Sequence, residues 1–192
     1  DPNGAWVGGQ IFVDPTTQGV TWIDYPSLGY TDDKITVSIN LFTRDTNAFF
    51  GSTVYVVDKA ALYASSHALI LDRFVLTNKG GTHTPAVTLD PSQATQFLLG
   101  RWSGSSLVAF EVTGRPGLGN TALRQLGFVS TTGPSWAPFP PRADFAPQAG
   151  NPRGIHVNDD RIQNVVLRGG ILHAVQTINL PAAAPTRAAV QW

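Results

Sequence analysis

The sequence contains no cysteine and no methionine, and it is poor in charge. Without cysteine, disulfide bonds and thiolate metal sites are excluded, although the redox compartment stays open. Because translation starts with methionine, a chain that begins at Asp1 is expected to have been processed or trimmed. The thirteen basic and thirteen acidic side chains cancel. This balance disfavours nucleic acids and anionic membranes as partners, since both attract a positive field.

Long apolar runs are also missing. No segment approaches the roughly 18 consecutive apolar residues of a membrane-spanning helix, so no membrane span is expected. Three lysines against ten arginines, together with 19 glycines and 14 prolines, favour an exported bacterial protein, secreted or periplasmic. The 192 residues and the hydrophobic fraction of 42% suit a single domain, residues 1–192, with its own core.

Apolar residues alternate with period two in most segments, which is typical of β-strands. Gly, Pro, Asn and Asp separate these segments, as expected for turns. One short stretch, residues 58–67, is compatible with a helix. The sequence therefore predicts an all-β protein, with strands at residues 7–13, 35–43, 53–57, 73–77, 96–102, 107–113, 123–130, 162–167, 171–178 and 188–192.

Two stretches echo each other: TDDKITVSIN begins at Thr31, and NDDRIQNVVL begins at Asn158. Half of that separation leads to Thr95, where TQFLLGRW starts another strand. Recurrence of this kind predicts repeated supersecondary units, here residues 31–94, 95–157 and 158–192. The N-terminal stretch AWVGGQIFV would complete the last unit with a fourth strand.

Four-stranded units placed side by side predict a β-propeller-like array, and a β-sandwich with recurring hairpins is the alternative. A closed propeller has about four to eight blades, so three units do not close a ring. We therefore expect either a piece of a longer propeller chain or a ring assembled from several copies.

Four stretches carry a family resemblance. GVTW, which ends at Trp22, matches the second half of the sialidase Asp-box, although Pro15 and Thr17 replace the Ser and Asp of that motif. The other three are WIDYPSLGYTDDKITVSINLF, GSTVYVVDKAAL and the ending DDRIQNVVLRGGILHAVQTINL with AAVQW. They resemble uncharacterised secreted bacterial β-propeller proteins of the sialidase-like type. The resemblance covers under half of the chain and implies a propeller fold, export and no settled activity. Relatives of this kind usually have more blades.

Four aspartates could bind a metal. Asp32 and Asp33 precede one predicted strand, and Asp159 and Asp160 precede another. Carboxylate oxygens are the ligands that Ca²⁺ prefers, but no EF-hand spacing is present. The alternative is that these residues cap strand starts and discourage edge pairing. No other cofactor is expected.

Motifs for catalysis are weak. The four histidines are scattered without zinc-site spacing, and no Gly-x-Ser-x-Gly elbow is present. Glycoside hydrolysis usually needs two carboxyl groups, yet Glu111 is the only glutamate. Sialidases hold the substrate carboxylate with an arginine cluster, which Arg44, Arg101 and Arg168 could form from strand ends.

Aromatic and polar residues at strand ends and in loops are the remaining candidates. We predict a non-enzymatic extracellular binding module of β-propeller type, whose ligand is a glycan or a protein. The alternatives are a glycan-cleaving hydrolase of sialidase-like type and a structural fragment of a larger propeller protein. No catalytic residues are assigned, and the predicted ligand-binding residues are Tyr25, Asn40, Arg44, Trp102, Trp136, Arg168 and His173.

Overall fold

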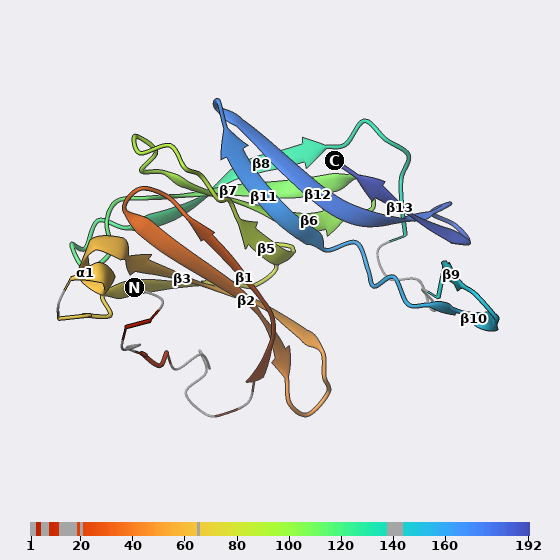
Figure 1. Cartoon of the computed structure of the whole chain (residues 1–192), viewed down its shortest axis with the longest axis horizontal. Coiled ribbons are helices and arrows are strands. Elements are labelled where there is room, and N and C mark those ends of the chain that lie inside the picture. The colour runs from red at the N-terminus through yellow and green to blue at the C-terminus, as the bar shows by residue number, and fades with distance from the viewer. Residues whose placement is uncertain (1–2, 5–7, 12–18, 20, 65, 138–143) are drawn as a thin grey trace.

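The computed structural model describes residues 3–4, 8–11, 19, 21–64, 66–137 and 144–192 (Figure 1). The all-β prediction is confirmed, because the described residues form thirteen strands and a single five-residue helix, α1 (Lys59–Tyr63). The strands are β1 (Thr21–Tyr30), β2 (Lys34–Thr43), β3 (Phe49–Asp58), β4 (Leu71–Leu76), β5 (Gly81–Pro85), β6 (Gln96–Ser103), β7 (Ser106–Thr113), β8 (Ala122–Ser130), β9 (Ala146–Gln148), β10 (Asn151–Ile155), β11 (Ile162–Arg168), β12 (Ile171–Leu180) and β13 (Arg187–Gln191).

These strands build three antiparallel meanders and one small hairpin. The first sheet has the order β1-β2-β3-β4, the middle sheet β5-β6-β7-β8, and the third sheet β11-β12-β13. Every neighbour in a sheet is also the neighbour in sequence, so each sheet forms from local pairing. The hairpin of β9 and β10 projects from one side of the stack (Figure 1).

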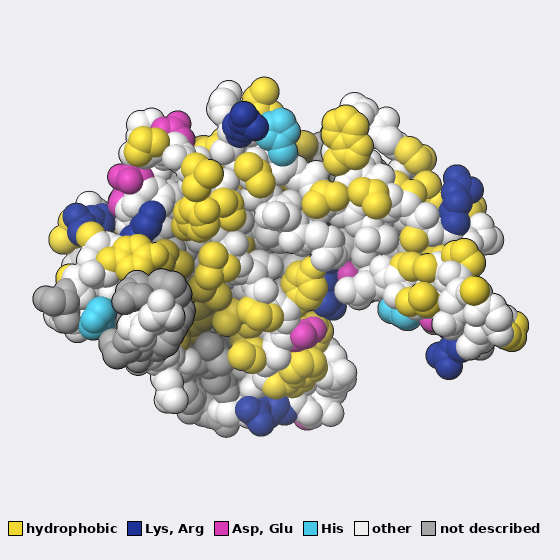
Figure 2. Space-filling view, viewed as in Figure 1, with side chains coloured by type: hydrophobic (Ala, Val, Ile, Leu, Met, Phe, Trp, Pro, Cys, Tyr) yellow, Lys and Arg dark blue, Asp and Glu magenta, His cyan; other side chains and the backbone are white. Residues whose placement is uncertain are grey.

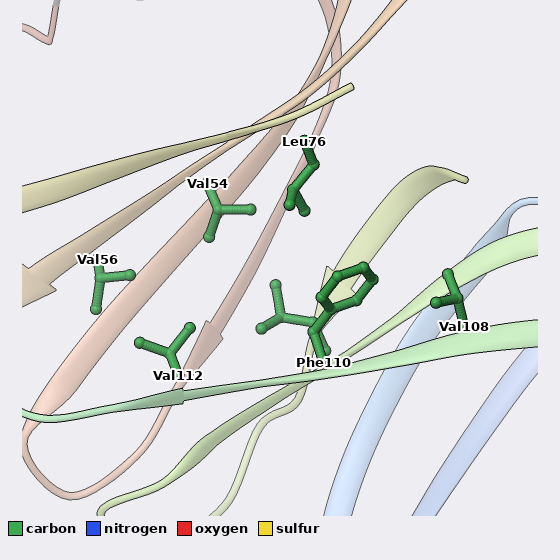
Figure 3. Packing of buried hydrophobic residues seen from close by; sticks show 7 residues of the cluster. Val54, Val56, Leu76, Val108, Phe110 and Val112 are labelled. Atoms are coloured by element: carbon green, nitrogen blue, oxygen red, sulfur yellow. The ribbon is translucent and has the colours of Figure 1, made fainter. Parts of the chain in front are cut away.

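The middle sheet is covered on both faces. Because side chains of a strand alternate between faces, β6 and β7 supply two apolar sets. One set, with Val108, Phe110 and Val112, packs against Val54 and Val56 of the first sheet (Figure 3).

The opposite face of the middle sheet packs against the third sheet. Leu99 and Ala109 contact the cluster that contains Ile162, Val165 and Leu167. The three sheets therefore form a stack of three layers, one more than the two layers of a β-sandwich.

The first strands of the three sheets lie side by side. Backbone bridges join Tyr30 to Val87 and Val87 to Val166, and both are parallel. The starts of β1, β5 and β11 therefore gather at one end of the stack, which we call the entry end. The turn between β1 and β2 lies at the opposite end.

Most predicted strands coincide with observed ones, and α1 lies inside the predicted helical stretch. Strands β1, β5, β9 and β10 were not predicted, and each contains a proline, a residue that normally interrupts ladders. Pro26 is tolerated because β1 is an edge strand with a register shift between Asp24 and Ser27. Of the N-terminal strand predicted at 7–13, residues 8–11 are not in a strand, and the rest lies outside the described residues.

The predicted repeats and the sheets are offset. Thr31 and Thr95 precede β2 and β6, the second strands of their sheets, whereas Asn158 precedes β11, the first strand of its sheet. The Asp-Asp echo thus marks two strand starts. In the described part of the chain, no helix is long and apolar enough to span a membrane.

Candidate functional site

A cleft opens between the first and middle sheets at the entry end. Its volume is about 580 Å³, within the usual range of ligand pockets. Its walls come from the end of β2, the start of β3, the connection from β4 to β5, the end of β6 and the residue before β11. The lining residues are Asn40, Phe42, Phe49, Phe50, Asn78, Gly80, Gly81, Thr82, Arg101, Trp102 and Arg161.

Asn40 shapes the floor of this cleft through its side-chain amide. Its Nδ2 donates to Thr82 Oγ1 at 2.8 Å, and its Oδ1 accepts from the Thr82 backbone N–H at 3.1 Å. The same oxygen accepts from Ser52 Oγ at 3.1 Å. Thr82 has a φ of 50°, which is unfavourable for a β-branched residue. Asn40 therefore fixes the backbone conformation that begins β5.

Aromatic rings form both walls. On one wall, Trp22 stacks on Phe42 with ring centroids 4.8 Å apart, and Phe49 meets Phe42 edge-on at 5.6 Å. On the other wall, Trp102 packs against Phe128 at 4.8 Å. Because Phe42, Phe49 and Trp102 each rest on another ring, these parts of the walls are held in place before any ligand arrives.

A buried carboxylate supports the cleft from behind. Asp160 is fully buried, and its Oδ1 lies 2.9 Å from Nε of Arg101. Its Oδ2 accepts from the indole N–H of Trp136 at 2.8 Å. Burial raises the pKa of Asp160 to about 6, while Arg101 and Trp136 act in the opposite direction.

Arg161 closes one side of the cleft and stacks on Tyr25. Its guanidinium carbon lies 4.7 Å from the centroid of the Tyr25 ring, a cation–π arrangement. Its Nε lies 3.1 Å from Asp159, and its Nη1 lies 3.7 Å from Asp24. Burial is the main reason that the pKa of Tyr25 is raised.

Two lining residues of the cleft and the neighbouring Tyr25 have left-handed backbone conformations. Tyr25, Asn78 and Thr82 have φ values of 53°, 56° and 50°. Non-glycine residues in this region each cost of the order of 1–3 kcal/mol and persist only where surrounding contacts hold them. Such strain is common at functional sites, which supports the cleft as the candidate site.

Several predicted site residues meet at the cleft. Asn40 and Trp102 line it, Tyr25 stacks on Arg161, and Trp136 lies behind it on Asp160. Arg44 does not line it, and donates from Nε to the Thr21 carbonyl at 2.9 Å.

The remaining two predicted ligand residues lie elsewhere. His173 pairs with Val166 in the hairpin of β11 and β12, and Arg168 closes that hairpin opposite Ile171. Arg168 ends β11, seven residues after the cleft residue Arg161, or about 23 Å along an extended chain. The structure therefore does not bring Arg168 and Arg101 into one arginine cluster.

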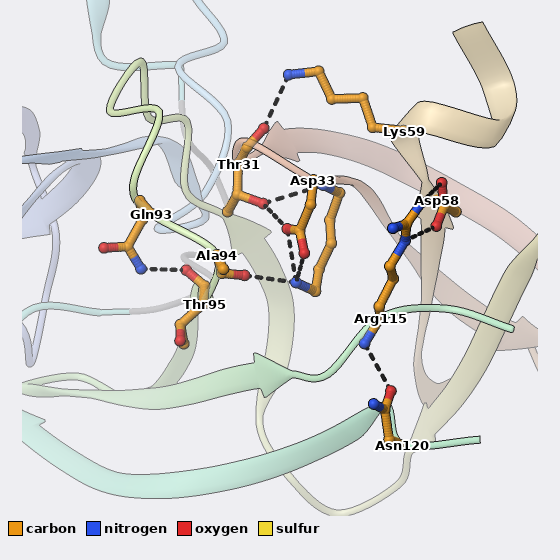
Figure 4. Close-up of polar contacts among 10 residues, drawn as sticks. Thr31, Asp33, Asp58, Lys59, Gln93, Ala94, Thr95, Arg115 and Asn120 are labelled. Carbon is orange, nitrogen blue, oxygen red and sulfur yellow. Dashed lines mark hydrogen bonds and ion pairs between the residues drawn. The ribbon is translucent and has the colours of Figure 1, made fainter. Parts of the chain in front are cut away.

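The first aspartate pair lies at the end of the stack away from the cleft. Asp33 accepts from Nζ of the buried Lys34 at 2.8 Å and from Thr31 Oγ1 at 3.0 Å (Figure 4). Lys34 also donates to the Ala94 carbonyl at 2.6 Å, which ties the turn to the middle sheet. Asp32 is exposed.

The two aspartate pairs do not share a site, because Asp159 and Asp160 lie at the entry end. Asp159 and Asp160 are paired with arginine, as Asp33 is with lysine. Within the described ranges, no group of three or more His, Asp or Glu side chains is placed to hold a metal ion. Calcium binding stays a prediction.

Other titratable groups have structural partners. Glu111 accepts from Nε of Arg124 at 2.8 Å on the middle sheet. Asp160 does not reach the cleft surface, since it is fully buried. His83 is buried edge-on against Phe110, with Nε2 3.0 Å from the Lys79 carbonyl. Burial lowers the pKa of His83 to about 4.

The sequence reasoning missed Phe42, Phe49, Phe50, Thr82 and Arg161. One signal was present: the Phe49-Phe50 pair follows a polar turn at the start of a strand, where a ring can lie at a sheet end. Thr82 and Arg161 had no such signal.

Comparison with known proteins adds no relatives. No family model, no curated protein and no solved structure matches this chain.

Proposed function

We propose that this chain is a non-enzymatic extracellular binding module, and that the cleft at the entry end binds a glycan. The observation that carries the proposal is the combination, in one cleft, of supported aromatic walls with Arg101 and Arg161. A sugar ring has an apolar face of C–H groups and an equator of hydroxyls. An aromatic ring such as Trp102 can pack on the apolar face, and the guanidinium groups can donate hydrogen bonds to the hydroxyls.

The shape of the site favours a glycan over a protein. A protein ligand usually needs a broad surface of about 800 Å² on each partner. A concave site of about 580 Å³ suits a short oligosaccharide instead. On the face drawn in Figure 2, charged groups are small and separate, with both signs present.

We also propose that the three stacked sheets are consecutive blades of a β-propeller. Face-to-face packing of two four-stranded meanders and one three-stranded meander, together with the side-by-side first strands, supports this reading. Since a ring has about four to eight blades, a second copy would supply the remainder. Sedimentation equilibrium over a range of concentrations tests the assembly: a stable dimer is expected, and a monomer at every concentration would contradict it.

Isothermal titration calorimetry with a panel of uncharged oligosaccharides tests the binding proposal. The panel contains cellotetraose, β-1,4-mannotetraose, xylotetraose and chitotetraose. Trp102→Ala is expected to weaken binding of the best member about tenfold or more, because truncating an aromatic anchor of a binding site commonly costs about 1–2 kcal/mol of binding free energy or more. Trp192→Ala is the matched control, since Trp192 is 96% exposed and lies outside the cleft.

Two results would contradict the proposal. One is saturable binding that Trp102→Ala leaves unchanged. The other is no binding by any panel member, at concentrations up to the millimolar range, to a protein shown to be folded by circular dichroism.

A further inference from the structure

Asp160 joins three segments that are distant in sequence. It precedes β11, it contacts Arg101 at the end of β6, and it accepts from Trp136 in the connection after β8. Its side chain is completely buried, whereas the side chain of Arg101 is 18% exposed and lines the cleft. This ion pair restrains the orientation of the guanidinium group, because the group is rigid and planar.

The charges around the cleft do not balance. Two arginines, Arg101 and Arg161, face three carboxylates, Asp24, Asp159 and Asp160. The sum of these five groups is one negative charge. Lys79, in the adjoining connection from β4 to β5, donates to Gln125 at 3.3 Å.

The three carboxylates do not line the cleft, so an anionic ligand would experience this excess from behind the two arginines. Electrostatic interactions strengthen where burial lowers the effective dielectric constant, and Asp160 and Asp159 are both buried. A carboxylated sugar would compete with Asp160 for Arg101 and with Asp159 for Arg161. An uncharged sugar would accept hydrogen bonds from the parts of Arg101 and Arg161 that line the cleft, without displacing either carboxylate.

We propose that Asp160 is a positioning residue that holds Arg101 for hydroxyl recognition, and that its charge restricts the cleft to uncharged sugars. This inference rests on the proposed glycan-binding function and adds the ligand class to it. Trp136 helps to hold Asp160 in place, because its indole N–H donates a hydrogen bond to the second carboxylate oxygen.

The positioning half is tested without a ligand. In Asp160→Asn the side chain keeps its shape and an oxygen acceptor, but loses its charge. By ¹⁵N NMR in slightly alkaline buffer, the Arg101 Nε–H signal is expected to shift markedly. The Trp136 indole N–H signal is expected to remain resolved from those of the other tryptophans. Asp90→Asn, an exposed carboxylate outside the cleft, should change neither signal. An unchanged Arg101 signal in Asp160→Asn would overturn the proposal.

The selectivity half uses matched probes in calorimetry. β-1,4-mannotetraose is compared with the β-1,4-linked tetramer of mannuronic acid, and cellotetraose with its uronic acid counterpart. Asp160→Asn is expected to raise the affinity for the uronates about tenfold, and to lower the affinity for the neutral sugars about threefold because Arg101 is no longer held in place. Equal uronate affinity in wild type and variant would refute selectivity. If no probe binds either protein, the selectivity half falls with the glycan proposal, while the NMR result still decides the positioning role.

Discussion

Removal of the Asn40 amide should destabilise the whole entry end. In Asn40→Ala, the Thr82 backbone N–H and the Ser52 hydroxyl lose their buried acceptor, and Thr82 loses its side-chain donor. Each buried polar group left without a partner costs about 1–3 kcal/mol. Thr82 would also lose the contacts that hold its left-handed backbone. The expected loss in free energy of unfolding is about 3–5 kcal/mol, a large share of an ordinary domain's stability.

Urea unfolding followed by tryptophan fluorescence measures this loss. Asn164→Ala is the control, because Asn164 is exposed on β11 and should change stability by less than about 0.5 kcal/mol. Thr82→Gly in the Asn40→Ala background should recover part of the loss, since glycine adopts positive φ without strain. If Asn40→Ala stays within about 1 kcal/mol of wild type, Asn40 does not hold Thr82 in the way argued.

Three further predictions test other parts of the structure. Because the pKa of His83 is lowered to about 4, its contribution to stability is complete above pH 6.5 and is lost as the pH falls through 4. The raised pKa of Asp160 changes stability with pH in the opposite direction, so the test uses an Asp160→Asn background. There, His83→Gln should reduce the loss of unfolding free energy at acidic pH by up to about 3 kcal/mol, measured by urea unfolding. Asp58→Ala removes the N-cap of α1 and a partner of an arginine, and should cost about 1–2 kcal/mol, with Asp58→Asn closer to wild type in thermal melts. Gly29→Ala would place a Cβ 2.6 Å from the Ala86 carbonyl oxygen, so a loss of about 1–3 kcal/mol is expected, and no change would contradict the close contact of the first strands.

The fold class and most strands followed from period-two alternation, because this pattern reflects local geometry. The strands with proline escaped prediction, since Pro26 is allowed only where β1 is an edge strand and bulges. Which strands share a sheet was also partly local, as all three large sheets are meanders. How the sheets stack is not local, and the offset of the predicted repeats from the sheets shows this limit.

The site depends on that stacking, and therefore less of it was predictable. Trp102 and Tyr25 could be nominated because rings at strand ends and beside turns reach sheet edges. The contacts of Asn40 with Thr82 and of Asp160 with Arg101 join residues about 40 and 60 positions apart, which no spacing rule relates. In isolation, a buried aspartate before a strand suggests a cap or a metal ligand. Only the stack shows that Asp160 faces an arginine and an indole, and this pairing makes it a support of the cleft wall.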